Sequence, residues 1–363
     1  MNKTDFIIFD VLARNLGRPI SILELTREAS KIYGSAYYKN IYQKVQEMKG
    51  KGLLRIAAAG NTSFLSLNFD NYMLSSLMAE AENEKKAILL RDNRQILPLM
   101  QDMERCFRAG LLISSVSIAR PEKLLSRRRA ELLFILPELP PLEIEGIQEP
   151  KEKAEADILK TKLSICSIIK MLENHYNIKI DSLALKRSEF FSLLESGNPE
   201  IGDILSDQLA FFRPEDFWIT IGEAAWKGAI NWKDKTDPSK ISESDIAYNA
   251  IRFGYSEFGE KAKGKETGME YIIVSMLLSG KERWKEAVPV ILAKNKANYP
   301  LLIFLSNKYN VPGKLLGLLN ILAKTKKDRK ASEAAKLLEA MEIKEEKADE
   351  KSIRKKMAVY NAA

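Results

Sequence analysis

The sequence predicts a multidomain α+β protein whose C-terminal part is entirely helical. Three observations support this fold class. Before residue 72, three short helical patterns precede two strand-like runs; residues 93–220 alternate between strand and helix signals; and from about residue 221 amphipathic helices follow one another without strands. A chain of 363 residues is long enough for two or three domains, each with its own core.

The bulk composition narrows the class of protein. The chain has 57 Lys and Arg against 49 Asp and Glu, so its net charge of +8 favours a polyanionic partner without identifying it. Cys106 and Cys166 lie in apolar helical patterns without a CxxC motif, which predicts buried free thiols and no zinc site or disulfide framework. No run reaches the roughly 18 apolar residues of a membrane span, and the N-terminus lacks signal-peptide features. We therefore expect a cytoplasmic protein without membrane contact.

Residues 1–72 have the element order of a winged helix. "TDFIIFDVLARN" predicts a first helix, "SILELTREASKIYG" a second helix from a Ser21 cap to Gly34, and "AYYKNIYQKVQEMKGKG" a third helix capped by Ser35. The strand-like runs "LLRIAAAG" and "NTSFLSLN" then meet at Gly60 and Asn61, a pair typical of hairpin turns. Three helices followed by a hairpin define the winged-helix order.

This N-terminal part also carries most of the positive charge. Residues 1–60 contain ten Lys or Arg and five Asp or Glu, a net +5 of the total +8. In the third helix the spacing predicts an inward face made of Tyr38, Ile41, Val45 and Met48. The outward residues are then Lys39, Asn40, Gln43 and Lys44. Amides bond adenine edges and lysines contact phosphates, so this pattern predicts a DNA-reading helix, with the wing adding Arg55, Asn61 and Thr62.

The run "ISILELTREASKIYGSAYYKNIYQKVQEMKGKGLLRI" resembles winged-helix transcription regulators. The resemblance covers about a fifth of the chain and implies binding to double-stranded DNA. A winged helix used for protein or RNA contacts remains an alternative, because fold analogy alone does not determine function.

After a connecting helix over residues 73–92, residues 93–220 predict an α+β domain. "SVSIARPEKLLSRRRAELLFILPE" resembles the minimal nucleotidyltransferase pattern, in which a strand ends in Gly-Ser, an Ala-Arg-Gly turn follows, and the next strand begins Asp-x-Asp. In this chain the corresponding residues are Val116, Ser117, Ala119, Arg120, Pro121, Arg129, Ala130 and Glu131. By this resemblance the site is degenerate: Val116 hinders phosphate approach, and Arg129 puts a positive charge where a metal-binding acid is needed.

The prediction for this domain is an inactive enzyme remnant with no catalytic residue, resident metal or cofactor. If the site were active, Ser117, Glu131 and Asp181 would carry the chemistry, as in a nucleotidyltransferase of a toxin and antitoxin pair. We expect Ser117 and Glu131 to lie near each other across paired strands. Arg127, Arg128 and Arg129 should rim the same opening and bind an anion, unless they pair with the acids of residues 143–155.

Residues 221–342 predict an all-helical domain, and residues 343–363 a charged tail that is disordered. We expect Trp218, Trp226, Trp232 and Trp284 to fill the core. Segments such as "RFGYSEFGEKAKGKETGMEY" look like uncharacterised archaeal proteins that join the same three regions. The sequence thus favours a DNA-binding transcriptional regulator whose other domains sense, scaffold or form a homodimer. An active nucleotidyltransferase and a protein-interaction scaffold of a larger complex stay open as alternatives.

Overall fold

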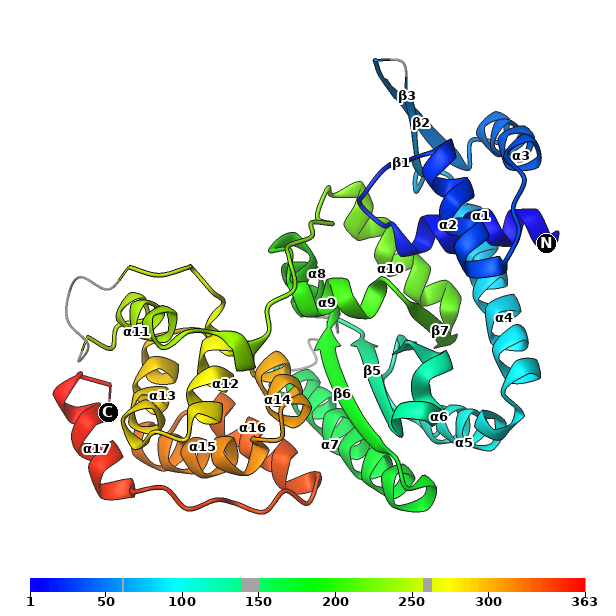
Figure 1. Cartoon of the computed structure of the whole chain (residues 1–363). Helices are drawn as coiled ribbons and strands as arrows, with labels where there is room; N and C mark the ends of the chain where they lie inside the picture. The colour runs from blue at the N-terminus through cyan, green and yellow to red at the C-terminus, as the bar shows by residue number, and fades with distance from the viewer. Residues whose placement is uncertain (61, 139–150, 257–262, 363) are drawn as a thin grey trace, which may run out of the picture. The chain divides into compact units, whose positions relative to one another are not determined.

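The computed structural model describes residues 1–60, 62–138, 151–256 and 263–362 (Figure 1). It confirms a mixed α+β protein with two small sheets. The chain forms two compact units, which are described separately below. The first contains Met1–Leu139, Ile178–Ile180 and Ala184–Lys235, and the second contains Pro140–Asn177, Asp181–Leu183 and Thr236–Ala363.

The first unit begins with three helices and a three-stranded antiparallel sheet. The elements are α1 (Lys3–Arg14), β1 (Ile20–Ser21), α2 (Ile22–Tyr33), α3 (Tyr38–Gly50), β2 (Leu54–Ala59) and β3 (Thr62–Leu67), with strand order β1-β3-β2. The short β1 was not predicted, because it is defined by pairing with β3, where Ile20 lies opposite Leu65. The helices pack through apolar side chains such as Ile8, Leu25 and Val45, all fully buried.

Local capping explains where α2 begins and ends. The Ser21 hydroxyl accepts a hydrogen bond from the Glu24 amide while the Glu24 carboxylate accepts one from the Ser21 amide, which is a capping box. The helix ends at Gly34, whose φ of 80° is a left-handed conformation that glycine adopts without strain. The prediction that Ser35 caps the third helix is wrong: α3 begins after Tyr37, which makes no side-chain cap.

The rest of the first unit surrounds a four-stranded sheet with the order β6-β5-β4-β7. Its strands are β4 (Ser115–Ala119), β5 (Arg129–Leu136), β6 (Lys179–Lys186) and β7 (Gln208–Phe212), and β4 runs antiparallel to β5 and β7. The helices are α4 (Leu74–Asp92), α5 (Leu97–Phe107), α6 (Leu124–Arg127), α8 (Arg187–Glu195), α9 (Pro199–Leu205) and α10 (Pro214–Trp226), with short 3₁₀ turns at Arg94–Ile96 and Pro121–Lys123.

The helix over residues 73–92 is more than a connector. α4 packs along α10 and against β7, and it also contacts α1. A buried polar network reinforces this packing: the Asp10 carboxylate accepts hydrogen bonds from Arg14 at 2.9 Å and from the Tyr33 hydroxyl at 2.7 Å, and it pairs with Lys85 of α4 at 2.9 Å. Arg14 also bonds Asp207 at 2.5 Å. The N-terminal elements and the four-stranded sheet therefore belong to one compact unit.

The second unit is helical. Its elements are α7 (Lys151–Tyr176), a 3₁₀ turn at Pro238–Lys240, α11 (Glu243–Arg252), α12 (Met269–Ser279), α13 (Glu282–Lys294), α14 (Tyr299–Lys308), α15 (Pro312–Lys326), α16 (Arg329–Ala340) and α17 (Glu350–Val359). α7 packs on α16, so it does not belong to the α+β region as its place within residues 93–220 suggested. None of the described helices is long and apolar enough to cross a membrane.

The prediction of a disordered tail over residues 343–363 is also wrong for its described part. α17 packs on α13 and α15, and it buries Ile353 and Met357. These two residues are four positions apart, so they lie on one face of a helix. Tyr360 also stacks on Tyr255 with ring centroids 4.8 Å apart, so apolar and aromatic contacts together dock this charged segment.

Candidate nucleic-acid interface and neighbouring sites

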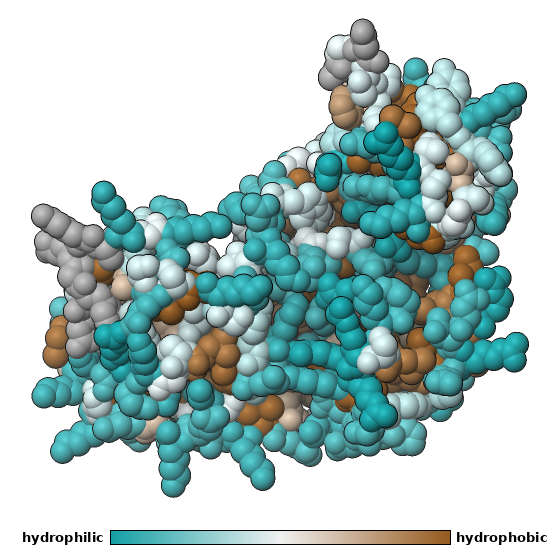
Figure 2. Space-filling model, viewed as in Figure 1, coloured by the Kyte–Doolittle hydropathy of each residue, from teal (hydrophilic) through white to brown (hydrophobic). Residues whose placement is uncertain are grey.

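The exposed face of α3 carries a row of amide and lysine side chains. Ile41, Val45 and Met48 are buried, as the sequence predicted. Lys39, Gln43 and Gln46 lie on the opposite face, where the spacings of four and three residues align them along the helix axis, and Asn40 is exposed beside them. In Figure 2 this part of the surface is pale to teal, as expected for tyrosine, amide and lysine side chains.

Gln46 belongs to this row but was missed by the sequence interpretation. The spacing of the residues could have predicted its exposure, because Gln46 follows Gln43 by three residues and does not share the helical face of the buried positions.

Two expectations for α3 need correction. Tyr38 was predicted to face inward, but it is 50% exposed and stacks on Tyr42 with ring centroids 6.1 Å apart. Lys44 was predicted to point outward, but its ammonium pairs with Asp5 at 3.2 Å and Glu47 at 2.7 Å. The reason is tertiary: position 44 lies at the edge of the buried face, where the first turn of α1 supplies Asp5. The exposed surface of α3 therefore has two tyrosine rings that were not expected, and Lys44 is held by acids of the protein.

The β2–β3 hairpin carries less charge than predicted. Arg55 lies toward its base, where it donates to the Asn68 side-chain oxygen at 2.8 Å and pairs with Asp70. Asn61 lies outside the described residues. The exposed side chains of the outer hairpin that the structure describes, Ala57, Ala58, Thr62 and Ser63, are uncharged. The described residues near the hairpin tip therefore offer hydroxyls and backbone groups to a partner.

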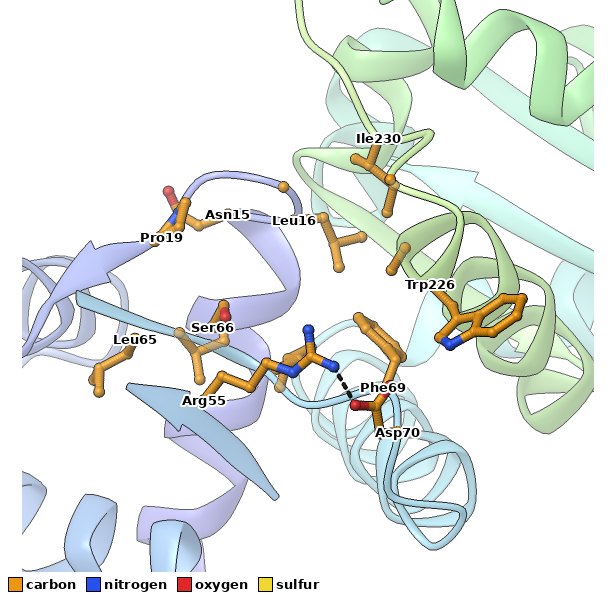
Figure 3. A pocket seen from close by; sticks show the side chains of 15 residues that line it. Asn15, Leu16, Pro19, Arg55, Leu65, Ser66, Phe69, Asp70, Trp226 and Ile230 are labelled. Carbon is orange, nitrogen blue, oxygen red and sulfur yellow. Dashed lines mark hydrogen bonds and ion pairs between the residues drawn. The ribbon is translucent and has the colours of Figure 1, made fainter. Parts of the chain in front are cut away.

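A pocket of about 240 Å³ lies next to the hairpin base (Figure 3). The Arg55–Asp70 ion pair borders it on one side, and Phe69, Ile230 and Trp226 supply apolar surface. Trp226 was predicted to be a core residue, yet it is 74% exposed, because it ends α10 beyond the part of that helix that packs on α4. An exposed indole beside a pocket is suited to contact with another molecule.

The predicted nucleotidyltransferase-like region contains a group of three carboxylates. Glu131 of β5 lies with Glu200 and Asp203 of α9, with their ligand oxygens within 4.8 Å of one another. Sequence reasoning identified only Glu131. Glu200 and Asp203 are three residues apart on a short helix whose start is fixed by the Asn198 cap, but nothing local in the sequence indicates that α9 packs on β4.

Arg120 provides the positive charge in this group. It follows β4 in a left-handed conformation, and its guanidinium donates to Glu131 and, at 2.8 Å, to Asp203. Lys235 also donates to Asp203 at 3.0 Å. Burial favours the neutral acid, but the hydrogen bonds from Arg120 and Lys235 outweigh it and lower the pKa of Asp203 below its ordinary value. Two basic side chains of the protein, Arg120 and Lys235, thus bond the carboxylates that could otherwise be ligands of a metal ion.

The other predicted site residues are placed as follows. On the paired strands β4 and β5, Ser117 lies opposite Leu133, and Ala119 lies opposite Glu131. Ser117 and Glu131 are therefore diagonal neighbours on one face of the sheet. Ser117 is fully buried, and its hydroxyl has no hydrogen-bond partner among the described residues. Asp181 is fully buried in β6 and is not part of the carboxylate group.

The three consecutive arginines lie where α6 gives way to β5. Arg127 and Arg128 are exposed, and Arg128 has a φ of 47° that turns the chain into the strand. Arg129 is half-buried at the start of β5. Of the acids over residues 143–155 that were the alternative partners of these arginines, Glu155 pairs with Arg329 at 3.3 Å, and those of residues 143–150 lie outside the described part of the chain.

Comparisons with family models, curated proteins and solved structures found no match to this chain. Its function must therefore be inferred from the geometry of these sites.

Proposed function

We propose that residues 1–72 form a winged-helix domain that binds double-stranded DNA, with α3 as the recognition helix and the β2–β3 hairpin as the wing. On this proposal the protein is a transcriptional regulator. The observation that carries it is the exposed row Lys39, Gln43 and Gln46 on a helix that precedes a hairpin, in the order α1-β1-α2-α3-β2-β3. The sheet order β1-β3-β2 is the one expected for a winged helix.

The chemistry of the α3 face fits a major groove. Asparagine and glutamine amides bond the adenine edge, and lysines neutralise phosphates. The one acid of α3, Glu47, is held by Lys44, so its charge is largely compensated within the protein. The start of α3 has no side-chain cap, which leaves its first backbone amides open to a phosphate oxygen.

The proposal also assigns the four-stranded sheet to a catalytically inactive, nucleotidyltransferase-like scaffold. Its support is Arg120, because a guanidinium bonded to Glu131 and Asp203 competes with any divalent ion for the same oxygens. The alternative of an active nucleotidyltransferase has one observation in its favour, the three carboxylates that lie within reach of one ion.

The DNA proposal is tested by fluorescence anisotropy of the full chain with a labelled random-sequence duplex at several salt concentrations. We expect affinity to fall steeply with salt, since each phosphate contact releases a counterion. Lys39→Ala should weaken binding to every duplex and reduce the log–log salt slope by about 1. Lys330→Ala, an exposed lysine on α16 of the second unit, is the matched control and should leave both values unchanged.

Three results would contradict the proposal: no binding of the duplex, affinity that does not respond to salt, or equal losses in the Lys39 and Lys330 variants. Absence of duplex binding would favour a protein-contact role. The exposed Trp226 beside its pocket supports that second candidate. Trp226→Ala should then abolish a protein interaction while leaving the fold unchanged, as judged by circular dichroism.

A further inference from the structure

A second cavity, of about 290 Å³, lies in the first compact unit between the end of α1, α9 and residues 232–235. Among the described residues that line it, four are basic: Arg14 and Arg18 from the N-terminal side, and Lys233 and Lys235 from the other. Asp203 is the one acidic lining residue in that set. The cavity thus has an excess of positive charge, and the proposed DNA interface does not include it.

The charges of the lining residues are not all compensated by the protein. Arg14 is bonded to Asp10 and Asp207, and Lys235 to Asp203. Arg18 and Lys233 are both exposed, and neither forms an ion pair with any described residue. Asp234 follows Lys233 in the chain but does not line the cavity. Arg18 interacts electrostatically with Glu24 but not at ion-pair distance, so the edge of this concave surface has two exposed cations without a salt bridge among the described residues, which favours an anionic ligand.

The cavity also has a fixed aromatic wall. The Trp232 indole N–H donates to the Leu16 carbonyl, which holds the ring against the loop after α1. The ring packs so closely on Gly202 that a Cβ at that position would lie 2.9 Å from it. Gly17, with a φ of 69°, allows the same loop to approach Ile230, where a Cβ would lie 2.7 Å from the Ile230 side chain. The position of the Trp232 ring therefore depends on glycine at residues 17 and 202.

We propose that this cavity binds a small phosphorylated molecule, with its phosphate between Arg18 and Lys233 and the rest of it against Trp232. The guanidinium of Arg18 can bond two phosphate oxygens at once, and Lys233 supplies a point charge on the opposite side. The volume is close to the lower limit of about 300 Å³ for small-molecule pockets, so it suits a group the size of a nucleotide or sugar phosphate. This inference does not depend on the DNA proposal.

The test is isothermal titration calorimetry of the full chain with pyrophosphate and with ADP. We expect saturable binding of at least one of them with one site per chain, weaker at high salt. The double variant Arg18→Ala/Lys233→Ala should lower affinity by about tenfold or more, because two charge-assisted hydrogen bonds are lost. Since both side chains are exposed and form no ion pair, this variant should fold normally, which circular dichroism checks.

Arg127→Ala/Arg128→Ala is the matched control, since it removes the same charge from the other candidate anion site. Its affinity for the probes should equal that of the unmodified protein. The proposal is overturned if neither probe binds saturably, or if the control variant loses affinity while Arg18→Ala/Lys233→Ala does not. It is also overturned if Arg18→Ala/Lys233→Ala lowers affinity for the duplex and leaves affinity for the probes unchanged, because the two side chains would then contact the DNA backbone.

Discussion

Glu82 should make the stability of the first unit fall as pH rises from about 4.5 to about 7. This carboxyl group of α4 is completely buried, where it accepts hydrogen bonds from the Ala210 amide at 3.0 Å and the Gln208 side chain at 3.3 Å. Burial raises its pKa from 4.5 to about 7, and the nearby Asp10 adds to the rise, while Lys85 and the Ala210 amide oppose it. The folded protein therefore holds a proton that the unfolded chain releases.

The magnitude follows from this difference. A shift of about 2.5 units at about 1.36 kcal/mol per unit gives about 3 kcal/mol. Below pH 4.5 the group is protonated in both states and has no effect. Between 4.5 and 7 the unfolded chain binds fewer protons than the folded one, so the free energy of unfolding decreases as pH rises. Above pH 7 the loss is complete and constant.

Glu82→Gln isolates this effect, because the amide keeps a carbonyl for the Ala210 N–H and cannot ionise. Urea unfolding is followed by tryptophan fluorescence, to which Trp218, Trp226 and Trp232 of the first unit contribute. The variant should match the unmodified protein at pH 4.5 and exceed it by up to about 3 kcal/mol at pH 8. The reasoning would be refuted if the free energies of unfolding of the variant and the unmodified protein changed in parallel with pH. Asp10 does not interfere, because its pKa of about 2 places its own loss of stability at lower pH.

Three further predictions concern other parts of the chain. Gln46→Ala should reduce affinity for a preferred duplex by about 1–3 kcal/mol without changing the salt slope, as measured by anisotropy; a changed slope would indicate a phosphate contact instead. Arg120→Ala should destabilise the first unit by up to about 3–5 kcal/mol at neutral pH, because the partly buried carboxylates of Glu131 and Asp203 lose their bonds to the guanidinium, although Asp203 keeps its bond to Lys235. Mn²⁺ should raise the melting temperature of this variant and not of the unmodified protein; an equal rise in both would mean that the native site already binds metal and would favour the active-enzyme alternative. Ile353→Ala should lower the melting temperature of the second unit by the equivalent of about 2–5 kcal/mol, and an unchanged value would show that α17 does not need this contact.

The parts of the fold that sequence reasoning predicted are those with local causes. Ser21 and Glu24 lie three residues apart, so the start of α2 was visible in the sequence. The spacing of Ile41, Val45 and Met48 identified the buried face of α3. β1 could not be predicted in the same way, because two residues have no periodicity and become a strand only by pairing with β3.

Prediction was least accurate for the contacts of individual side chains, whether the partner is distant or near in the sequence. Lys44 has the helical phase of a surface residue, and only the fold brings Asp5 within 3.2 Å of it. Helical phase likewise indicates an inward Tyr38, whereas the structure has its ring stacked on Tyr42 at the surface. In both cases the periodic pattern predicted the helix correctly and the partner of the side chain incorrectly.

Arg120 shows why the contacts of a site are hard to predict from a resemblance to a motif alone. The motif compares this chain with an enzyme position by position, and it draws attention to Arg129, the basic residue at the place of a metal-binding acid. In the structure the cation that bonds Glu131 is Arg120, which the motif treats as a matching residue of the turn. Its second partner, Asp203, is 83 positions away on α9, and that carboxylate is shared with Lys235. Since one guanidinium joins β4, β5 and α9, it offsets the repulsion between the carboxylates and helps to keep the sheet and α9 together, which a position-by-position comparison of motifs could not have predicted.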